Sequence, residues 1–285
     1  MKKFLALILA ALMFLTVFVA CGPVEVSVDD ASGANLADEG NDAAPASDWE
    51  YIQNNGKLVV GMTLFAPMNY YDDDNNFVGF ETEFAKAVGE KLGVDVEFVE
   101  IDWTTKEIEL AAKSIDCIWN GMTITPERAE AMSISTPYMA NKQVLVAKAE
   151  NAESYATPGN LTDKIVVAEA ESAGEGVATG DNYFASANYV AVDTMAKALM
   201  EVSSGTADAC VVDYVAAIGM IGEGTDYADL VTVDTDDFSP EEYGVAFRKG
   251  SDVTEKANAA MAELAAEGTL KEIAANYKLD ELLLF

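Results

Sequence analysis

The feature that most constrains the fold is an alternation of short apolar runs with longer amphipathic segments. In the first half of the chain, apolar residues recur at helical spacing over 80–92, and Gly93 follows as a helix stop. The pattern predicts strands at 57–61, 94–98 and 115–119 and helices at 80–92 and 108–112. Strands that alternate with helices are typical of an α/β fold with mostly parallel strand pairing, which we expect here.

The second half of the chain repeats this alternation. It predicts strands at 165–167, 190–192 and 209–212 and helices at 195–202 and 215–221. The pair Asp116 and Cys117 after one predicted helix is echoed by Asp208 and Cys210 after another. Two similarly built lobes are the simplest explanation. The tail, 251–277, is expected to be helical with a break near Gly268.

Composition excludes several classes of function. The chain has 285 residues, of which 51% are apolar, so it can bury the cores of two domains. The 49 acidic residues exceed the 17 basic ones, and the net charge of −32 repels nucleic acid, so we expect no nucleic-acid partner. Histidine is absent, which excludes histidine-dependent nucleophilic catalysis and histidine-liganded zinc. The functions that composition still allows are carboxylate chemistry, binding of metals through oxygen ligands, and plain ligand binding.

The N-terminus has the pattern of a secretory signal. Lys2 and Lys3 precede the apolar run 4–20, and 18–21 resembles a bacterial lipobox with Cys21 as the lipidated residue. An uncleaved anchor helix is the alternative. We predict a signal peptide at 1–20 and, at 21–48, a lipidated Cys21 (a palmitate anchor) with an acidic, disordered tether. The folded part is expected outside the cytoplasm, tethered to the membrane.

Three positions could bind a charged ligand. Thr125 suits a helix N-cap, and Arg128 in that helix could clamp a carboxylate or pair with a surface acid. Ser172 and Glu175 form a capping box, whose free N–H groups attract anions, although an ordinary capped helix is more common. Asp213 follows a strand and could bind an ammonium group or cap the next helix.

Other patterns favour structural roles. Phe65, Trp103, Tyr70 and Tyr71 could line an apolar slot, although aromatic residues more often belong to the core. Residues 72–83 have calcium-loop spacing, but Phe77 stands where glycine is required, so a polar hairpin turn is favoured and no metal is expected. Cys117 and Cys210 are interpreted as two buried small residues and not as a disulfide.

Several stretches, taken in order, resemble the polar amino-acid-binding proteins of bacterial ABC importers, solute-binding protein family 3. They are 79–81, Trp103, 121–128 (GMTITPER), 135–138 (STPY), 172–175 (SAGE), Asp213 and 242–248 (EYGVAFR). The resemblance covers nearly all of 50–285. It implies a two-lobed periplasmic-binding-protein-like fold of type II, with crossovers near 144–147 and 245–247. Lobe 1 would comprise 50–143 plus 246–285, and lobe 2 would comprise 144–245.

The resemblance also implies roles for individual residues. Arg128 would bind the ligand α-carboxylate, together with Thr123 and with the Ala173 N–H beside Ser172. The Gly121 carbonyl and Asp213 would bind the α-ammonium group. Phe65 and Trp103 would sandwich the side chain, and Met122 belongs to the same motif. The implied partners are a free amino acid and an ABC permease, with no cofactor and a monomeric chain.

Four residues depart from the family pattern. Glu81 stands where Asp is usual, Glu171 where Gly is usual, and Met62 where an acid often reads the side chain. Glu169 could receive a cationic or amide side chain, or be a solvated surface glutamate. Two other functions stay open, a dehydratase-like enzyme on the same scaffold and a ligand-sensing domain. An acid near Arg128 that could bind an ammonium group favours amino-acid binding over an enzyme.

Overall fold

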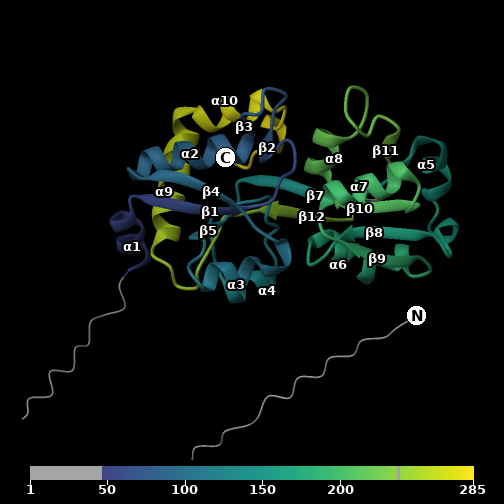
Figure 1. Cartoon of the computed structure of the whole chain (residues 1–285), viewed down its shortest axis with the longest axis horizontal. Helices are drawn as coiled ribbons and strands as arrows, with labels where there is room; N and C mark the ends of the chain where they lie inside the picture. The colour runs from purple at the N-terminus through teal and green to yellow at the C-terminus, as the bar shows by residue number, and fades with distance from the viewer. Residues whose placement is uncertain (1–46, 236–237) are drawn as a thin grey trace, which may run out of the picture. The chain divides into compact units, whose positions relative to one another are not determined.

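The computed structural model describes residues 47–235 and 238–285, which hold two main β-sheets flanked by helices (Figure 1). The predicted signal peptide, Cys21 and almost all of the predicted tether lie outside these residues. In the described part, no helix has both the length and the apolar character that a membrane span requires.

The first sheet has five strands in the order β4-β1-β5-β13-β6. Strands β4, β1 and β5 are parallel, whereas β13 pairs antiparallel with both β5 and β6. The strands predicted at 57–61, 94–98 and 115–119 are confirmed as β1, β4 and β5. The strand bounds are β1 Lys57–Met62, β4 Asp95–Glu100, β5 Cys117–Ile118, β6 Ser133–Ile134 and β13 Ala246–Phe247.

Helices cover both faces of the first sheet (Figure 1). In that view α2 and α10 lie above the sheet, and α3 and α4 lie below it. The helix predicted at 80–92 is confirmed as α2, and Gly93 ends it in the left-handed conformation. The bounds are α2 Phe80–Leu92, α3 Lys106–Ala111, α4 Pro126–Ala131, α9 Val253–Glu267 and α10 Thr269–Asn276, with a 3₁₀ turn at Trp103–Thr105 before α3.

The second sheet has six strands, with β11-β7-β10-β8-β9 in order and β12 also paired with β7. Its parallel part is β10-β8-β9, and the remaining pairs are antiparallel. Helices α7 and α8 lie above it in Figure 1, and α6 lies below. The bounds are β7 Met139–Lys148, β8 Ile165–Glu169, β9 Asn188–Val192, β10 Ala209–Asp213, β11 Leu230–Thr232, β12 Phe238–Tyr243, α5 Ala149–Tyr155, α6 Ala173–Gly180, α7 Met195–Ser204 and α8 Tyr214–Met220.

The two sheets, each with its helices, form two lobes that are joined by β7 and β12. These strands pair antiparallel from Met139 opposite Tyr243 to Gln143 opposite Phe238. The first predicted crossover, 144–147, follows this stretch along β7, in the part of the strand that pairs with β10 of the second sheet. The second, 245–247, overlaps β13 in the first sheet. The lobe boundaries at 143/144 and 245/246 stay a prediction.

Asp48, predicted to be the last residue of the tether, instead begins helix α1 (Asp48–Asn55). Its carboxylate pairs with Arg248 at 2.8 Å and with Lys113 at 3.1 Å. Arg248 also pairs with Asp116 at 3.0 Å, so the start of the folded chain is attached to the first lobe. The prediction missed this because the partners of Asp48 are distant in sequence.

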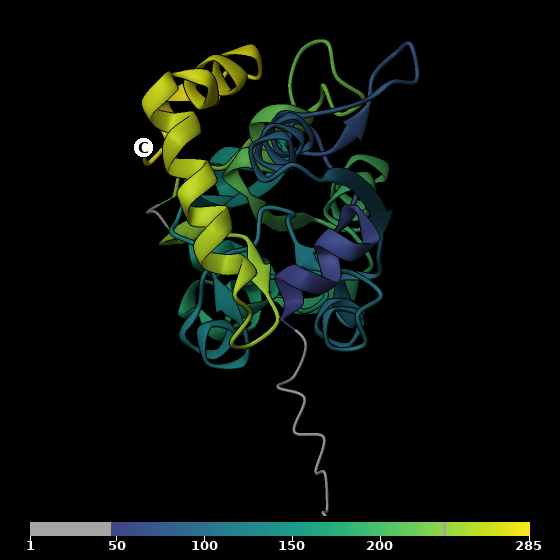
Figure 2. The same cartoon turned by 90° about the vertical axis from the view of Figure 1, so that its left-hand side faces the viewer.

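The C-terminal helices and one surface hairpin confirm local predictions. Helix α9 runs across the first lobe in Figure 2, and Gly268, with φ of 82°, separates it from α10. Strands β2 (Tyr70–Tyr71) and β3 (Phe77–Val78) form the predicted hairpin. In its turn Asp72 Oδ1 accepts hydrogen bonds from the N–H groups of Asp74 and Asn76. That carboxylate therefore organises the turn.

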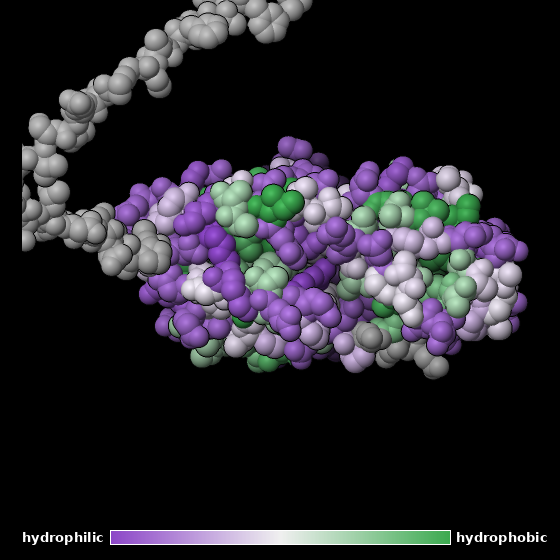
Figure 3. All heavy atoms as spheres, turned by 90° about the horizontal axis from the view of Figure 1, so that it is seen from below, coloured by the Kyte–Doolittle hydropathy of each residue, from purple (hydrophilic) through white to green (hydrophobic). Residues whose placement is uncertain are grey.

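Apolar residues of both lobes form the core. Cys117 and Cys210 are buried free thiols, as predicted. Hydrophilic residues dominate the face shown in Figure 3, with apolar side chains in small patches between them. Large exposed apolar side chains include Tyr71, Ile108 and Val190.

Candidate functional site

The carboxyl ends of strands β5, β8 and β10 point towards one cavity between the lobes. Parallel α/β sheets commonly bind ligands at such strand ends. The cavity is small: the space that the centre of a water molecule can reach within it measures about 10 Å³. Its lining comprises Trp103, Asn120, Gly121, Thr123, Arg128, Glu169, Ser172, Ala173, Met195 and Asp213. Eight of the ten predicted ligand-binding residues are therefore together, whereas Phe65 and Met122 are not in the lining.

Arg128 is held at the start of α4, where Thr125 caps the helix by accepting a hydrogen bond from the Arg128 N–H at 3.2 Å. Its guanidinium donates to the Thr123 carbonyl at 2.8 Å and to the Glu171 carbonyl at 3.1 Å. The second bond joins the two lobes. Among the described residues no carboxylate forms an ion pair with Arg128, so the alternative of a surface arginine paired with an acid is wrong. Burial lowers the pKa of Arg128.

Asp213 ends β10, and its side chain does not cap the following helix. Instead, its carboxylate accepts hydrogen bonds from the Gln143 amide and the Tyr243 hydroxyl. Burial raises the pKa of Asp213, although these hydrogen bonds oppose the shift. The helix-cap alternative is therefore wrong, and an acid supported by neutral donors lines the same cavity as Arg128.

The sequence analysis does not identify Glu241 of β12, an acid that lies beside the site. Its Oε2 atom accepts hydrogen bonds from the Thr123 hydroxyl at 3.1 Å and from the amides of Asn141 and Gln143, both at 3.0 Å. Burial raises the pKa of Glu241, and the nearby Asp213 adds to the shift. No sequence signal identifies Glu241, because β12 reaches the site only through its pairing with β7.

Helix α6 begins at the cavity, as the capping box predicts. Ser172 Oγ accepts a hydrogen bond from the Glu175 N–H at 3.1 Å. The return bond differs from the usual box, since Glu175 accepts from the N–H of Glu171 at 2.6 Å. Glu171 has a φ of 57°, which is left-handed, so this position needs the conformation that glycine adopts most easily. Ala173, the first helical residue, lines the cavity.

Glu169 ends β8 and is only 3% exposed, so the solvated-surface alternative is wrong. Burial raises its pKa to about 8, and the charge of Asp213 adds to the shift. Among residues 47–235 and 238–285 no group forms a hydrogen bond with Glu169 Oε1. A buried acceptor without a donor is uncommon in folded proteins and is costly.

Trp103 lies against two cations, one of which was not predicted. Lys106, 3% exposed, donates to the Trp103 carbonyl at 3.0 Å, and its Nζ lies 4.8 Å from the centre of the indole. The Arg128 guanidinium carbon lies 5.9 Å from the same ring. Lys106 Nζ also lies 3.6 Å from the Glu171 carboxylate. Burial lowers the pKa of Lys106, and repulsion from Arg128 adds to the effect.

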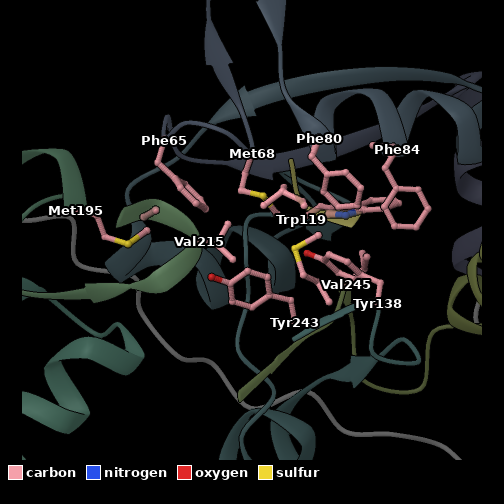
Figure 4. Close-up of a cluster of buried hydrophobic side chains, with 14 of the residues drawn as sticks. Phe65, Met68, Phe80, Phe84, Trp119, Tyr138, Met195, Val215, Tyr243 and Val245 are labelled. Atoms are coloured by element: carbon pink, nitrogen blue, oxygen red, sulfur yellow. The ribbon is translucent and has the colours of Figure 1, made fainter. Parts of the chain in front are cut away.

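Phe65 and Met122 lie behind the cavity wall. Phe65 is buried between Met68 and Met195 in Figure 4. A Cβ placed on Gly121, which has a φ of 54°, would lie 2.9 Å from the Phe65 ring. Met122 is fully buried in an apolar cluster with Trp103 and does not line the cavity.

Glu81, which departs from the family pattern, supports the cavity from inside the first lobe. Its fully buried carboxylate accepts hydrogen bonds from the Gly121 N–H at 2.7 Å, the Asn69 amide at 2.8 Å and the Tyr138 hydroxyl. Burial raises the pKa of Glu81 to about 7. The residue therefore positions the backbone of Gly121.

Comparison with known proteins connects this geometry to one family. A family model described as bacterial extracellular solute-binding proteins, family 3, matches residues 58–280. The L-cystine-binding protein TcyJ of Escherichia coli (strain K12) is 30% identical over 232 residues, which cover 78% of this chain and 82% of the relative. The arginine-binding extracellular protein ArtP of Bacillus subtilis (strain 168) is 27% identical and covers 76% and 84%.

Solved structures have the same two-lobed architecture. An ABC uptake transporter substrate-binding protein from Streptococcus pneumoniae, with bound histidine, is similar with a TM-score of 0.74 and 29% identity. The similarity covers 84% of this chain and 99% of that one. The predicted type II periplasmic-binding-protein-like fold is therefore confirmed.

Proposed function

This chain belongs to the bacterial extracellular solute-binding proteins of family 3, and from that premise we propose that it binds a free polar or cationic amino acid and delivers it to an ABC-importer permease. The observation that carries the proposal is the joint presence of Arg128 and Asp213 in one cavity. A free amino acid carries one carboxylate and one ammonium group, and buried charges require partners of opposite sign.

Each end of the ligand has proposed partners. Arg128 binds the α-carboxylate by two hydrogen bonds, together with the Thr123 hydroxyl and the N–H of Ala173 beside Ser172. Asp213 and the Gly121 carbonyl bind the α-ammonium group. Trp103 contacts the ligand side chain, and Phe65, lying behind Gly121, supports that wall, as does Met122.

Ligand binding is coupled to closure of the lobes. The hydrogen bond from Arg128 to the Glu171 carbonyl already joins the first lobe to the second. A carboxylate bound by Arg128 beside the start of α6 would add attraction across the same gap. The ligand then favours the closed form because it contacts both lobes only in that form.

The remaining parts of the proposal concern location and assembly. The chain is exported, cleaved after residue 20 and lipidated on Cys21, and it acts as a monomer outside the cytoplasm. The lobes comprise 50–143 plus 246–285, and 144–245. The enzyme alternative needs a general acid in the cavity, a role that Glu169 could serve, but it has no need of Asp213 as an ammonium partner, so amino-acid binding accounts for more of the cavity. Labelling with a radioactive fatty acid tests the anchor, since Cys21→Ala should abolish labelling.

The test of function is thermal unfolding of the purified protein against the twenty amino acids, cystine and ornithine, after partial unfolding and refolding to remove co-purified ligand. A ligand that binds only the folded state raises the Tm by mass action. We expect a rise with one chemical group of amino acids. A flat response to all of them would contradict the proposed function and favour other carboxylates or an enzyme.

Arg128→Ala should abolish binding of every amino acid, because the ligand carboxylate would be buried without its partner. Loss of such a partner costs on the order of 3–5 kcal/mol, which weakens affinity by at least a hundredfold. Isothermal titration calorimetry measures this loss, with the exposed Lys271→Ala as the control that removes a distant cation. Near-normal affinity in Arg128→Ala would refute the site assignment.

A further inference from the structure

We propose that Glu169 binds the side chain of the ligand and that this side chain carries a positive charge, as a guanidinium or an ammonium group. The inference rests on the proposed function and adds the ligand's chemical class to it. It depends on four observations about Glu169 and the groups that face it.

The first observation is the position of Glu169. It is the last residue of β8 and lines the same cavity as Arg128 and Asp213. Those two residues are the proposed partners of the α-carboxylate and the α-ammonium group. A third charged group in the cavity is therefore left to face the ligand's side chain.

The second observation is that Glu169 lacks the support that the neighbouring acids have. Asp213 accepts hydrogen bonds from Gln143 and Tyr243. Glu241 accepts hydrogen bonds from three side chains. Glu169 Oε1 is buried, and no residue in the described part of the chain donates to it. The protein thus satisfies its other buried acids and leaves this oxygen for a donor from outside the chain.

The third observation is that the nearby cations direct their N–H groups elsewhere. Lys106 donates to the Trp103 carbonyl and lies 3.6 Å from the carboxylate of Glu171. Arg128 donates to the carbonyls of Thr123 and Glu171. Both cations lower the pKa of Glu169 through their charge, but no ion pair between either of them and Glu169 occurs in the described ranges.

The fourth observation is the balance of charge around the cavity. The cations that act on the site are Arg128 and Lys106, and the acids outnumber them: Glu169, Asp213, Glu241, Asp102, Glu107 and Glu171. A neutral zwitterion leaves this balance unchanged, whereas a ligand with an additional positive charge offsets the excess acid. A donor with a full positive charge is also the strongest partner for a buried carboxylate.

The ionisation of Glu169 gives the inference a distinct signature. Its pKa in the free protein is about 8, set by burial and by Asp213 and Asp102, with Lys106 and Arg128 opposing them. Glu169 is therefore mostly protonated at pH 7. A bound cation favours the carboxylate form, so binding should release a proton, whereas a neutral side chain should release none.

The experiment is calorimetric titration at pH 7 with matched ligand pairs, L-arginine against L-citrulline and L-lysine against L-norleucine. Each pair has similar shape, and only one member has a charged side chain. Titration in two buffers of different ionisation enthalpy counts the protons released. We expect one of the cationic ligands to bind at least about tenfold more tightly than its neutral match. We also expect it to release close to one proton.

Variants then test whether Glu169 is responsible. Glu169→Gln should reduce the preference for the cation to within about threefold and remove the proton release, because the amide carries no charge. Glu169→Asp should keep the preference in part. Glu90→Gln, an exposed acid on α2, should change neither quantity.

The outcomes separate this inference from the proposed function. Equal or tighter binding of the neutral ligands by the unaltered protein would overturn the inference and leave amino-acid binding intact. A preference for the cation that persists unchanged in Glu169→Gln would also overturn it. Binding of no amino acid at all would refute the proposed function, and the inference with it.

Discussion

Acidic residues of this chain have different roles that depend on their partners. Asp48 is held by Arg248 and Lys113, and these cations lower its pKa against the effect of burial. Asp213 has only neutral donors, and Glu169 has a buried oxygen with none. The first environment stabilises the fold, whereas the other two keep an acid available at the cavity. Residue type alone could not distinguish these cases.

Glu171→Gly should stabilise the protein. A left-handed φ destabilises a residue that has a side chain by about 1–2 kcal/mol, and glycine removes this cost. The greater freedom of glycine in the unfolded chain offsets part of the gain. The ion pair with Lys106 is long and its acid is 61% exposed; the lysine is buried but keeps its hydrogen bond to the Trp103 carbonyl, so loss of the pair offsets only part of the gain. We expect a net gain of about 0.5–1 kcal/mol in urea unfolding.

Two variants control for charge and for glycine itself. Glu171→Gln removes the charge but keeps the strained backbone, so its stability should stay close to that of the unaltered protein. Asn75→Gly, at a φ of 61°, should gain less, because asparagine tolerates this conformation. If Glu171→Gly is no more stable than Glu171→Gln, strain at this position is not the cause.

Helices and strands were largely predictable because their signal is local. The helix at 80–92 with its Gly93 stop, and the caps at Thr125 and Ser172, depend on residues within a few positions of one another. Helix α1 was missed, because Asp48 is held in place by long-range ion pairs.

The site was predictable only in part, because many of its contacts are also long-range. Its motif residues lie at strand ends and helix starts, which the local pattern identifies. The residues that satisfy them come from other parts of the chain. Gln143 and Tyr243 support Asp213 from the two crossover strands, and Lys106 approaches Trp103 from α3. A pattern within one segment contains no information about such neighbours.

At the scale of elements, Gly219 in helix α8 permits close contact between the lobes. A Cβ at this position would lie 2.6 Å from the carbonyl oxygen of Ala66, and closer still to Pro67, in the loop after β1 of the first lobe. The contact is against backbone, so it has little freedom to adjust. Gly219→Ala should therefore hinder closure without altering any cavity-lining residue.

We expect Gly219→Ala to weaken amino-acid affinity by about tenfold or more, because part of the closure energy is lost. The stability of the free protein should fall little, since alanine also favours the helix. The control is Gly176→Ala in α6, where a Cβ would meet nothing within 4 Å. Calorimetric titration with the amino acid found by the Tm screen measures the affinity of both variants. Unchanged affinity in Gly219→Ala would mean that this contact does not limit closure.

At the scale of the whole molecule, the net charge of −32 and the buried acids both lower the stability of the folded protein as pH rises. High net charge of one sign repels itself and destabilises the compact state. The pKa values of Glu81 and Glu169 are raised to about 7 and about 8, and those of Asp213 and Glu241 are raised as well. All four acids bind protons more tightly in the folded chain than in the unfolded one.

The sign of the resulting pH dependence follows from proton linkage. Between the ordinary glutamate pKa of 4.5 and the folded values near 7 and 8, the folded protein holds more protons than the unfolded chain. Stability therefore falls as pH rises through this window. Below it, acids with lowered pKa values, such as Asp48 and Asp208, lose their favourable interactions. The Tm of the ligand-free protein should be highest near pH 4–5 and fall towards pH 8.

Comparison with Glu169→Gln isolates one contribution to this slope. The amide has no proton to lose, so the variant should gain stability relative to the unaltered protein as pH rises from 5 to 8. The relative gain should be on the order of a few kcal/mol, or several degrees in Tm. If the two proteins lose Tm in parallel, Glu169 ionises as it does in water and the cavity does not desolvate it. A saturating cationic ligand should flatten the slope of the unaltered protein alone, because the bound cation replaces the proton as the partner of this carboxylate.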